Sequence, residues 1–193
     1  MRITEAFFIV VCSLAAHCSS GQTNENPNAR AARETHERAA WGIATNGVQF
    51  GIRICAIGPS DADKLKICSY LYDATSTNIY GLWRLPPGYR FEMTLKTQDG
   101  EEIEKTRKGS ALCRKPSSAI ISNGRVVVLD PKLPQEYDEV FDLRDCFNIV
   151  ESGSYILRVK AKLYAMKAYN EFVRLEIPEA TIQVVLDESD LEK

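Results

Sequence analysis

The sequence predicts an all-β protein built as a single antiparallel β-sandwich, and two observations support this. Beyond Trp41, hydrophobic and polar residues alternate along short segments such as 48–55 and 89–97, which is the pattern of strands buried on one face. Turn-forming pairs such as Asp99-Gly100 and Asn123-Gly124 follow such segments at short intervals. Closely spaced strands joined by turns are typical of an antiparallel sandwich or barrel, and not of a parallel α/β sheet.

Each predicted strand is a short run of alternating or β-branched residues bounded by turn residues. These segments are 48–55, 64–72, 79–85, 89–97, 101–106, 119–122, 125–130, 139–145, 154–165, 171–177 and 180–187. Pro86-Pro87-Gly88 stops one of them, and Pro178 separates the last two. Asn123-Gly124 is expected to join 119–122 to 125–130 as a β-hairpin. No helix is expected within this body.

Length and charge limit the classes of protein that fit. The chain has 193 residues, and its formal net charge is -2. This length fits one domain with appendages, and we assign 42–187 to the sandwich domain and 188–193 to a C-terminal tail. The near-neutral charge argues against a strongly basic nucleic-acid binder, so no nucleic-acid partner is expected. No apolar run reaches the roughly 18 residues needed to cross a bilayer.

Residues 1–18 are predicted to be a signal peptide. Arg2 gives a weakly positive start, and 6–16 form an apolar run that is too short for a membrane anchor. We therefore expect an exported protein that is periplasmic, secreted or a cell-envelope lipoprotein. The segment ending at Cys18 resembles a bacterial lipobox, which implies lipidation of Cys18, although His17 departs from that pattern. Plain cleavage is the alternative, and the lipid is the only membrane contact expected.

Residues 19–41 are predicted to link the signal peptide to the domain. The stretch 19–28 is polar and lacks the apolar surface needed for order, so it is expected to be a tether. The stretch 29–41 is rich in Ala and contains oppositely charged pairs four residues apart, such as Arg30 and Glu34. A short exposed helix and further linker are both consistent with this composition.

The segment 151–159 suggests a more specific fold. Glu151, Gly153 and Tyr155 resemble a tyrosine corner, in which the tyrosine hydroxyl bonds to an upstream backbone group. Cys68 and Trp83 are similarly placed to the strand-B cysteine and strand-C tryptophan of immunoglobulin-like domains. On these residues the chain resembles an immunoglobulin-like β-sandwich. Leu157 stands where the second cysteine would be, so the resemblance implies no inter-sheet disulfide of the antibody type.

Two further segments carry resemblances. Residues 41–54 resemble the opening of uncharacterised exported bacterial proteins that continue into a sandwich. Residues 129–143, followed by 152–157, resemble the proline-turn, Phe-strand and Gly-x-Tyr order of small all-β proteinase-inhibitor domains. Neither resemblance implies an active site in this chain.

Histidine usage argues against several kinds of catalysis. The chain has two histidines, His17 and His36, and both precede the predicted domain. A Ser-His-Asp or Cys-His arrangement within the domain is therefore excluded, and a zinc site with histidine ligands is strongly disfavoured. We expect no enzyme activity, no cofactor and no metal.

Four cysteines fall in the predicted domain, and export favours disulfides between them. They are Cys55, Cys68, Cys113 and Cys146. We favour Cys55–Cys68, because these two flank one connection between neighbouring strands, together with Cys113–Cys146. Buried free thiols are the alternative. A zinc site of four cysteines is disfavoured because the chain has no CxxC pair.

Two charged clusters are candidate functional sites. Asp138, Glu139, Asp142 and Asp145 could support glycoside hydrolysis if two of them faced one cleft, although a solvated strand edge is favoured. The basic loop 105–115 could bind phosphates or acidic polymers, but neighbouring glutamates cancel much of its field. A solvated loop is therefore the favoured interpretation.

Aromatic residues give the main indication of recognition. Tyr70, Tyr72, Trp83 and Tyr89 crowd into a short stretch and could form a recognition patch, or could belong to a two-sided core. We predict a non-catalytic exported binding module at the bacterial cell envelope, with a protein or glycan partner. The alternative is a proteinase inhibitor that uses the loop 83–90. A carboxylate-based glycan hydrolase is less favoured.

Overall fold

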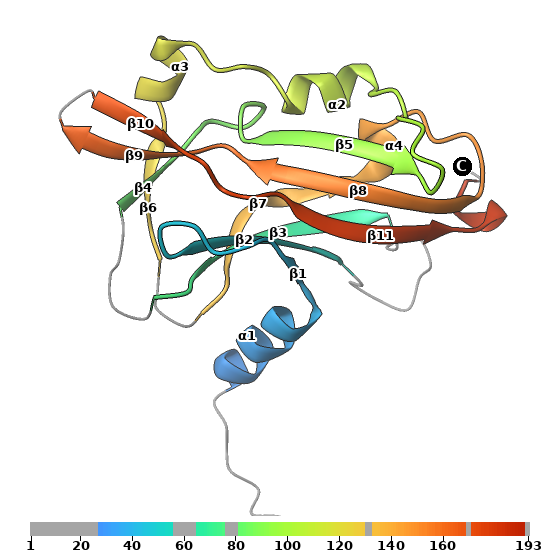
Figure 1. Cartoon of the computed structure of the whole chain (residues 1–193), viewed down its shortest axis with the longest axis horizontal. Coiled ribbons are helices and arrows are strands. Elements are labelled where there is room, and N and C mark those ends of the chain that lie inside the picture. Colours follow the sequence, from blue (N-terminus) through green and yellow to red (C-terminus); the bar gives the residue numbers. More distant parts are fainter. Residues whose placement is uncertain (1–26, 56–64, 76–80, 130–132, 169–170, 192–193) are drawn as a thin grey trace, which may run out of the picture.

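The structure, a computed structural model, describes residues 27–55, 65–75, 81–129, 133–168 and 171–191. The predicted signal peptide, with Cys18, lies outside these residues. The described chain is mostly β-strand, and all of its strand pairs are antiparallel (Figure 1). The all-β prediction is therefore confirmed.

The strands form three sheets. The first sheet has the order β1-β2-β3-β7, with β1 at Ala40–Trp41, β2 at Val48–Ile54, β3 at Lys66–Asp73 and β7 at Gln135–Asp142. The second has the order β10-β9-β4-β6, with β10 at Glu171–Leu175, β9 at Leu163–Ala168, β4 at Gly81–Arg84 and β6 at Arg125–Val128. The third has the order β11-β8-β5, with β11 at Ala180–Leu186, β8 at Gly153–Ala161 and β5 at Phe91–Thr97.

The main hydrophobic core lies between the first and third sheets. Phe50 on β2, Phe91 on β5 and Tyr137 on β7 are buried at its centre. The ring centroid of Phe91 lies 6.2 Å from that of Phe50 and 5.6 Å from that of Tyr137. Burial of each such side chain stabilises the fold by about 1.5–3 kcal/mol. Both sheets therefore depend on one shared set of aromatic contacts.

Strand β8 shows the predicted alternation directly. Tyr155, Leu157 and Val159 are buried, whereas Arg158 between them is exposed. The Tyr155 hydroxyl donates a 2.6 Å hydrogen bond to the carbonyl oxygen of Glu151, which is the upstream backbone bond expected for a tyrosine corner. The ring is thus buried while its polar atom keeps a partner.

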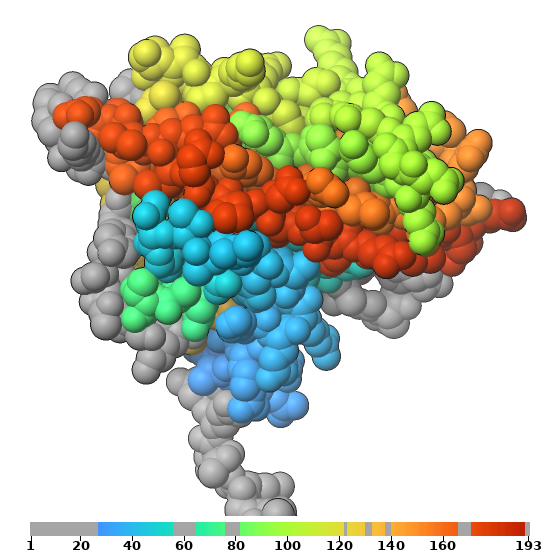
Figure 2. All heavy atoms as spheres, in the orientation of Figure 1, coloured from blue at the N-terminus to red at the C-terminus, as the bar shows by residue number. Residues whose placement is uncertain are grey.

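The described residues also form five short helices. They are α1 (Pro27–Arg38), α2 (Arg107–Leu112), α3 (Ser118–Ser122), α4 (Leu143–Cys146) and the 3-10 helix η2 (Glu188–Asp190). Helix α1 confirms the first of the two alternatives for 29–41, and Arg30 pairs with Glu34 at 3.0 Å. Figure 2 shows α1, in blue, projecting from the body on the side of the first sheet.

The prediction that the body contains no helix was wrong. The segment 119–122, predicted as a strand, lies in α3, and 143–145 lie in α4. The side chain of Asp142 accepts a hydrogen bond from the Arg144 amide and so caps α4 where strand β7 ends. The Asn123-Gly124 pair ends α3 and does not form a hairpin turn, because both amides bond back to carbonyls of that helix. Short apolar runs carry no period that separates a strand from a helical turn.

The turn at Asp99-Gly100 is confirmed. Gly100 has a φ of 91°, which side chains disfavour, and its amide bonds to the Thr97 carbonyl at 3.0 Å. The predicted strand 101–106 is reduced to isolated bridges at Glu102 and Lys105. The chain leaves the sheet there to begin α2.

One of the two expected disulfides is formed. Cys55 and Cys68 form a disulfide, as predicted, with their Cα atoms 5.7 Å apart. Cys113 and Cys146 are free thiols, so the expected second bridge is not formed. Cys113 caps the end of α2 and Cys146 ends α4, and both side chains pack against the core as small apolar groups.

Replacing Tyr155 with Phe should lower the free energy of unfolding by about 1 kcal/mol, because the Glu151 carbonyl loses its donor. Tyr164→Phe is the matched control, since Tyr164 is similarly buried on β9 but its hydroxyl has no partner among the described residues. Urea unfolding of both variants checks this. Equal losses in the two variants would contradict a role for the Tyr155 hydroxyl.

Candidate functional site

The four aromatic residues predicted as a recognition patch do not form one surface. Tyr70 and Tyr72 lie on β3 in the first sheet, whereas Trp83 lies on β4 in the second. Tyr89 lies in the turn before β5, where its amide bonds to the Pro86 carbonyl. These residues are close in sequence but lie on different sheets, so they do not form one recognition patch.

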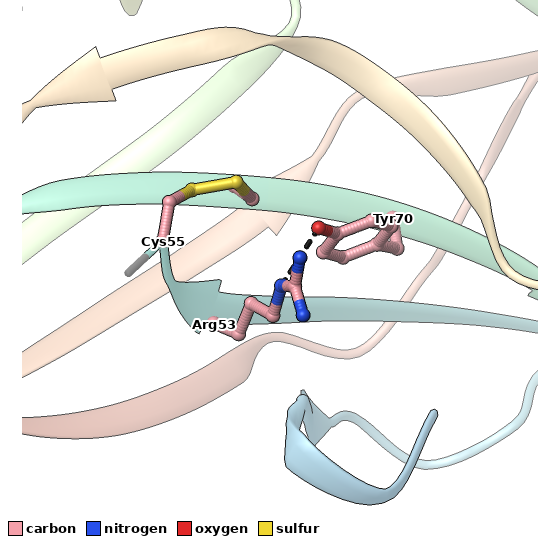
Figure 3. The surroundings of a disulfide bond; sticks show 4 residues. Arg53, Cys55 and Tyr70 are labelled. Carbon is pink, nitrogen blue, oxygen red and sulfur yellow. Dashed lines mark hydrogen bonds between the residues drawn. A yellow bond between two sulfur atoms is a disulfide. The ribbon is translucent and has the colours of Figure 1, made fainter. Parts of the chain in front are cut away.

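Tyr70 and Tyr72 are covered from outside. The Nε of Arg53 donates a 2.8 Å hydrogen bond to the Tyr70 hydroxyl, next to the Cys55–Cys68 disulfide (Figure 3). Burial raises the pKa of Tyr70 above its ordinary value. Tyr72 packs against the rings of Trp41 and His36, whose centroids lie 5.7 and 4.6 Å away.

Trp83 also has a packing role. Its Nε1 donates a hydrogen bond to the Ile121 carbonyl, and its ring lies 4.9 Å from that of Phe172. These contacts attach α3 and β10 to strand β4. The tryptophan therefore holds the second sheet and its helix together.

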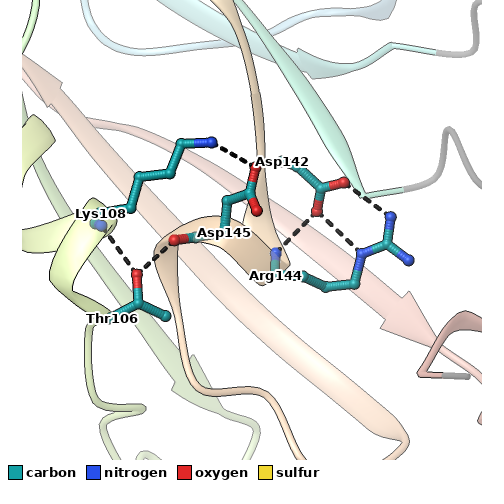
Figure 4. Close-up of polar contacts among 6 residues, drawn as sticks. Thr106, Lys108, Asp142, Arg144 and Asp145 are labelled. Atoms are coloured by element: carbon teal, nitrogen blue, oxygen red, sulfur yellow. Dashed lines mark hydrogen bonds and ion pairs between the residues drawn. The ribbon is translucent and has the colours of Figure 1, made fainter. Parts of the chain in front are cut away.

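The two charged clusters, in contrast, meet in the structure. Lys108, from the basic loop, pairs through Nζ with Oδ2 of Asp145 at 2.7 Å (Figure 4). Asp142 pairs with Arg144, which donates to Oδ1 from Nε at 3.1 Å and to Oδ2 from Nη2 at 2.8 Å. The side chains of Asp138 and Glu139 fall outside the described part of the chain.

These charges surround a cavity of about 500 Å³ where α2, α4, β5 and β7 meet. Its floor and walls include apolar side chains, and its rim carries two lysines and two aspartates. The lining residues are Lys66, Pro87, Phe91, Lys108, Leu112, Val140, Phe141, Asp142, Asp145 and Cys146. We call this cavity the α2–α4 pocket.

The contact between α2 and α4 shapes the wall of this pocket. A Cβ atom added at Gly109 would lie 1.9 Å from the Cys146 carbonyl oxygen, so only glycine permits the approach. The Thr106 hydroxyl caps α2 by accepting from the Gly109 amide and donates to the Asp145 carbonyl. Lys108 is thereby held over Asp145.

Lys108, Arg144 and Cys146, at or beside the pocket, are all held in their protonated forms. Donating hydrogen bonds to carboxylates raises the pKa of Lys108, beside Asp145, and of Arg144, beside Asp142. Burial raises the pKa of the Cys146 thiol to about 12, so Cys146 stays protonated. Both described carboxylates already accept from cations. The described lining residues thus offer shape and apolar surface, and they include no free acid–base pair.

Two kinds of feature, a metal-ligand cluster and a membrane-spanning helix, are absent from the described residues. They include no group of three or more His, Cys, Asp or Glu side chains placed to hold a metal ion. They also include no helix with the length and apolar character needed to cross a bilayer. Comparisons with protein-family models, with curated proteins and with solved structures find no match to this chain.

Sequence reasoning found both charged clusters but missed the pocket that they surround. Leu112, Val140 and Pro87 gave no signal of their own, because their positions on the pocket depend on the packing of α2 against α4. The sequence did contain a pattern that predicts the contact of Arg144 with Asp142. Asp142 precedes the short helix as a cap, and an arginine two residues later can reach back to it.

Native Cys146 should react with iodoacetamide far more slowly at pH 8 than the same residue in urea, because a pKa of about 12 leaves about one thiolate per ten thousand molecules. Between about pH 9 and 12 the free energy of unfolding should fall, since the unfolded chain releases this proton first. Peptide mass spectrometry measures the labelling. Equally fast labelling in native and unfolded chains at pH 8 would refute the buried thiol.

Proposed function

We propose that the protein is an exported, non-catalytic binding module that acts at the bacterial cell envelope. The observation that carries this proposal is the α2–α4 pocket, which combines apolar lining side chains with two aspartates that are each paired to a cation. Such a pocket gains free energy by burying apolar surface of a ligand. Its carboxylates are engaged with cations, which favours binding over proton transfer.

The pocket favours an apolar side chain of a protein partner over a glycan. A sugar presents many hydroxyl groups, and each needs a hydrogen-bond partner once it is buried. Lys108 and Asp145 satisfy each other, as do Asp142 and Arg144. An apolar anchor loses no such bonds on entering, and paired charges on the rim are typical of protein interfaces.

An immunoglobulin-like sandwich is the architecture that we propose for this module. Two antiparallel sheets share one core, and Tyr155 makes the hydrogen bond of a tyrosine corner. Such folds present loops and short helices from a rigid framework, as α2 and α4 do here.

The loop 83–90, the candidate for protease inhibition, is folded onto the body. Leu85 is 1% exposed and Arg90 is 8% exposed, and the Gly88 carbonyl accepts from the Arg114 amide. An inhibitory loop must present a side chain to a protease cleft. These contacts indicate that the loop supports the fold. No specific observation favours protease inhibition or glycan hydrolysis over the proposed binding function.

Export is supported by the Cys55–Cys68 disulfide, because such bonds persist in oxidising compartments. We expect mass spectrometry of the protein from its native cells to find a processed N-terminus. A chain that begins with lipid-modified Cys18 identifies a lipoprotein, and an unmodified processed chain identifies a periplasmic or secreted protein. An unprocessed chain beginning at Met1 would contradict export.

Val140→Asp should weaken partner binding about tenfold or more, because it places a charge in the apolar part of the α2–α4 pocket. Val185→Asp is the matched control, since Val185 is also an exposed valine on a strand, in the third sheet. A photo-crosslinking residue placed at each position in living cells identifies the partner, whose affinity for both variants is then measured by calorimetry.

Crosslinking at position 140 but not 185, with affinity lost only in Val140→Asp, would support the proposal. Equal crosslinking at both positions, no crosslinking at either, or an unchanged affinity in Val140→Asp would contradict it. Each variant is checked for its melting temperature, so that a folding defect is separated from a lost contact.

A further inference from the structure

The α2–α4 pocket is large for a single aliphatic side chain. Its volume of about 500 Å³ equals that of about 17 waters at about 30 Å³ each. An aliphatic side chain fills only part of this space, and the lining atoms around the remainder gain no contacts with it. Aromatic side chains bury about 150–250 Å² each, and tryptophan and tyrosine are common at the energetic centres of protein interfaces. The size of the pocket therefore favours a large aromatic anchor.

The lining offers both aromatic and aliphatic partners to such a ring. Phe91 and Phe141 line the pocket and pack on each other, with ring centroids 5.8 Å apart at an angle of 51°. Leu112 and Val140 add aliphatic surface, and Val140 is 43% exposed. Aromatic rings pair most favourably in offset or edge-to-face arrangements. A third ring can therefore extend the packing that the two phenylalanines begin.

Asp145 gives this pocket a hydrogen-bond acceptor that is not exhausted. Its Oδ2 accepts from Nζ of Lys108 at 2.7 Å (Figure 4). An ionised carboxylate has about four acceptor positions on its two oxygens, so this bond leaves capacity for a further donor. The backbone carbonyl of Asp145 accepts from the Thr106 hydroxyl, which holds the residue in place. One additional donor can be satisfied here, whereas the many hydroxyls of a sugar cannot.

The ammonium group of Lys108 lies next to that acceptor. The two side chains are 64% and 51% exposed, so their charged ends are at the mouth of the pocket and not beneath it. A cation near the face of an aromatic ring is attracted to it, and tryptophan gives the strongest attraction. A ring that donates to Asp145 would lie within reach of Lys108.

We propose, building on the binding function proposed above, that the anchor entering the α2–α4 pocket is a tryptophan side chain of the protein partner. The indole ring packs between the aliphatic and aromatic lining, and its one N–H donates to the carboxylate of Asp145. The ring then lies beside the ammonium of Lys108. Phenylalanine offers the ring without the donor, and leucine offers neither.

The test compares three capped amino acids as probes: N-acetyl-tryptophanamide, N-acetyl-phenylalaninamide and N-acetyl-leucinamide. Each is titrated into the full chain, and NMR follows the backbone amides of Leu112 and Val140. The tryptophan probe should bind saturably with a dissociation constant of about 1 mM or tighter. The phenylalanine probe should bind about threefold more weakly or worse, because it lacks the donor, and the leucine probe about tenfold more weakly or worse.

Asp145→Ala should reduce the affinity for the tryptophan probe to about that for the phenylalanine probe, because the acceptor is lost. Glu179→Ala is the matched control. Glu179 is a similarly exposed carboxylate paired with a basic side chain, Arg158, at 3.4 Å, and it is not among the described lining residues. This control should bind all three probes as the wild type does. Melting temperatures of both variants separate a folding defect from a lost contact.

Equal affinities for the tryptophan and leucine probes, with shifts at Leu112 and Val140, would overturn the tryptophan anchor and leave the proposed binding function standing. A preference for tryptophan over phenylalanine that persists in Asp145→Ala would overturn the hydrogen bond on which the inference depends. No saturable binding of any probe up to about 10 mM, or shifts that spare both amides, would contradict the pocket as a binding site and the proposed function with it. A preference lost only in Asp145→Ala would support the inference.

Discussion

Tyr137 connects all three sheets, and much of the architecture depends on its contacts. It lies on β7 in the first sheet and is 1% exposed, with its ring against Phe50 and against Phe91 of the third sheet. Its hydroxyl donates to the Lys162 carbonyl at 3.1 Å, in the link between β8 and β9. Its own carbonyl accepts from Arg84 of the second sheet. The contacts of this one buried residue thus join the core, the link between β8 and β9, and strand β4 of the second sheet.

The fold class follows from local sequence, and the exceptions have physical causes. Alternation with a period of two is a property of single strands, so β2, β5 and β8 are predictable from their own residues. Helices α3 and α4 are one turn or little more, too short to show a helical period. Their conformation depends on distant partners, as the bond from Trp83 to Ile121 shows.

The candidate sites were harder to predict because each joins residues far apart in the chain. The acidic cluster and the basic loop were both visible in the sequence, but the pairing of Lys108 with Asp145 requires α2 to pack on α4. The Cys55–Cys68 bond was predictable because one short connection brings its two strands together.

Pro87 forms part of the wall of the α2–α4 pocket and of a neighbouring cavity of about 280 Å³. The pyrrolidine ring restricts the backbone at Pro87, and it also restricts the conformation of the preceding residue, Pro86. The partition between the two cavities is consequently stiff, so neither compartment can expand by bending it into the other. The geometry of each is therefore set during folding, and a guest that enters must match a preformed shape.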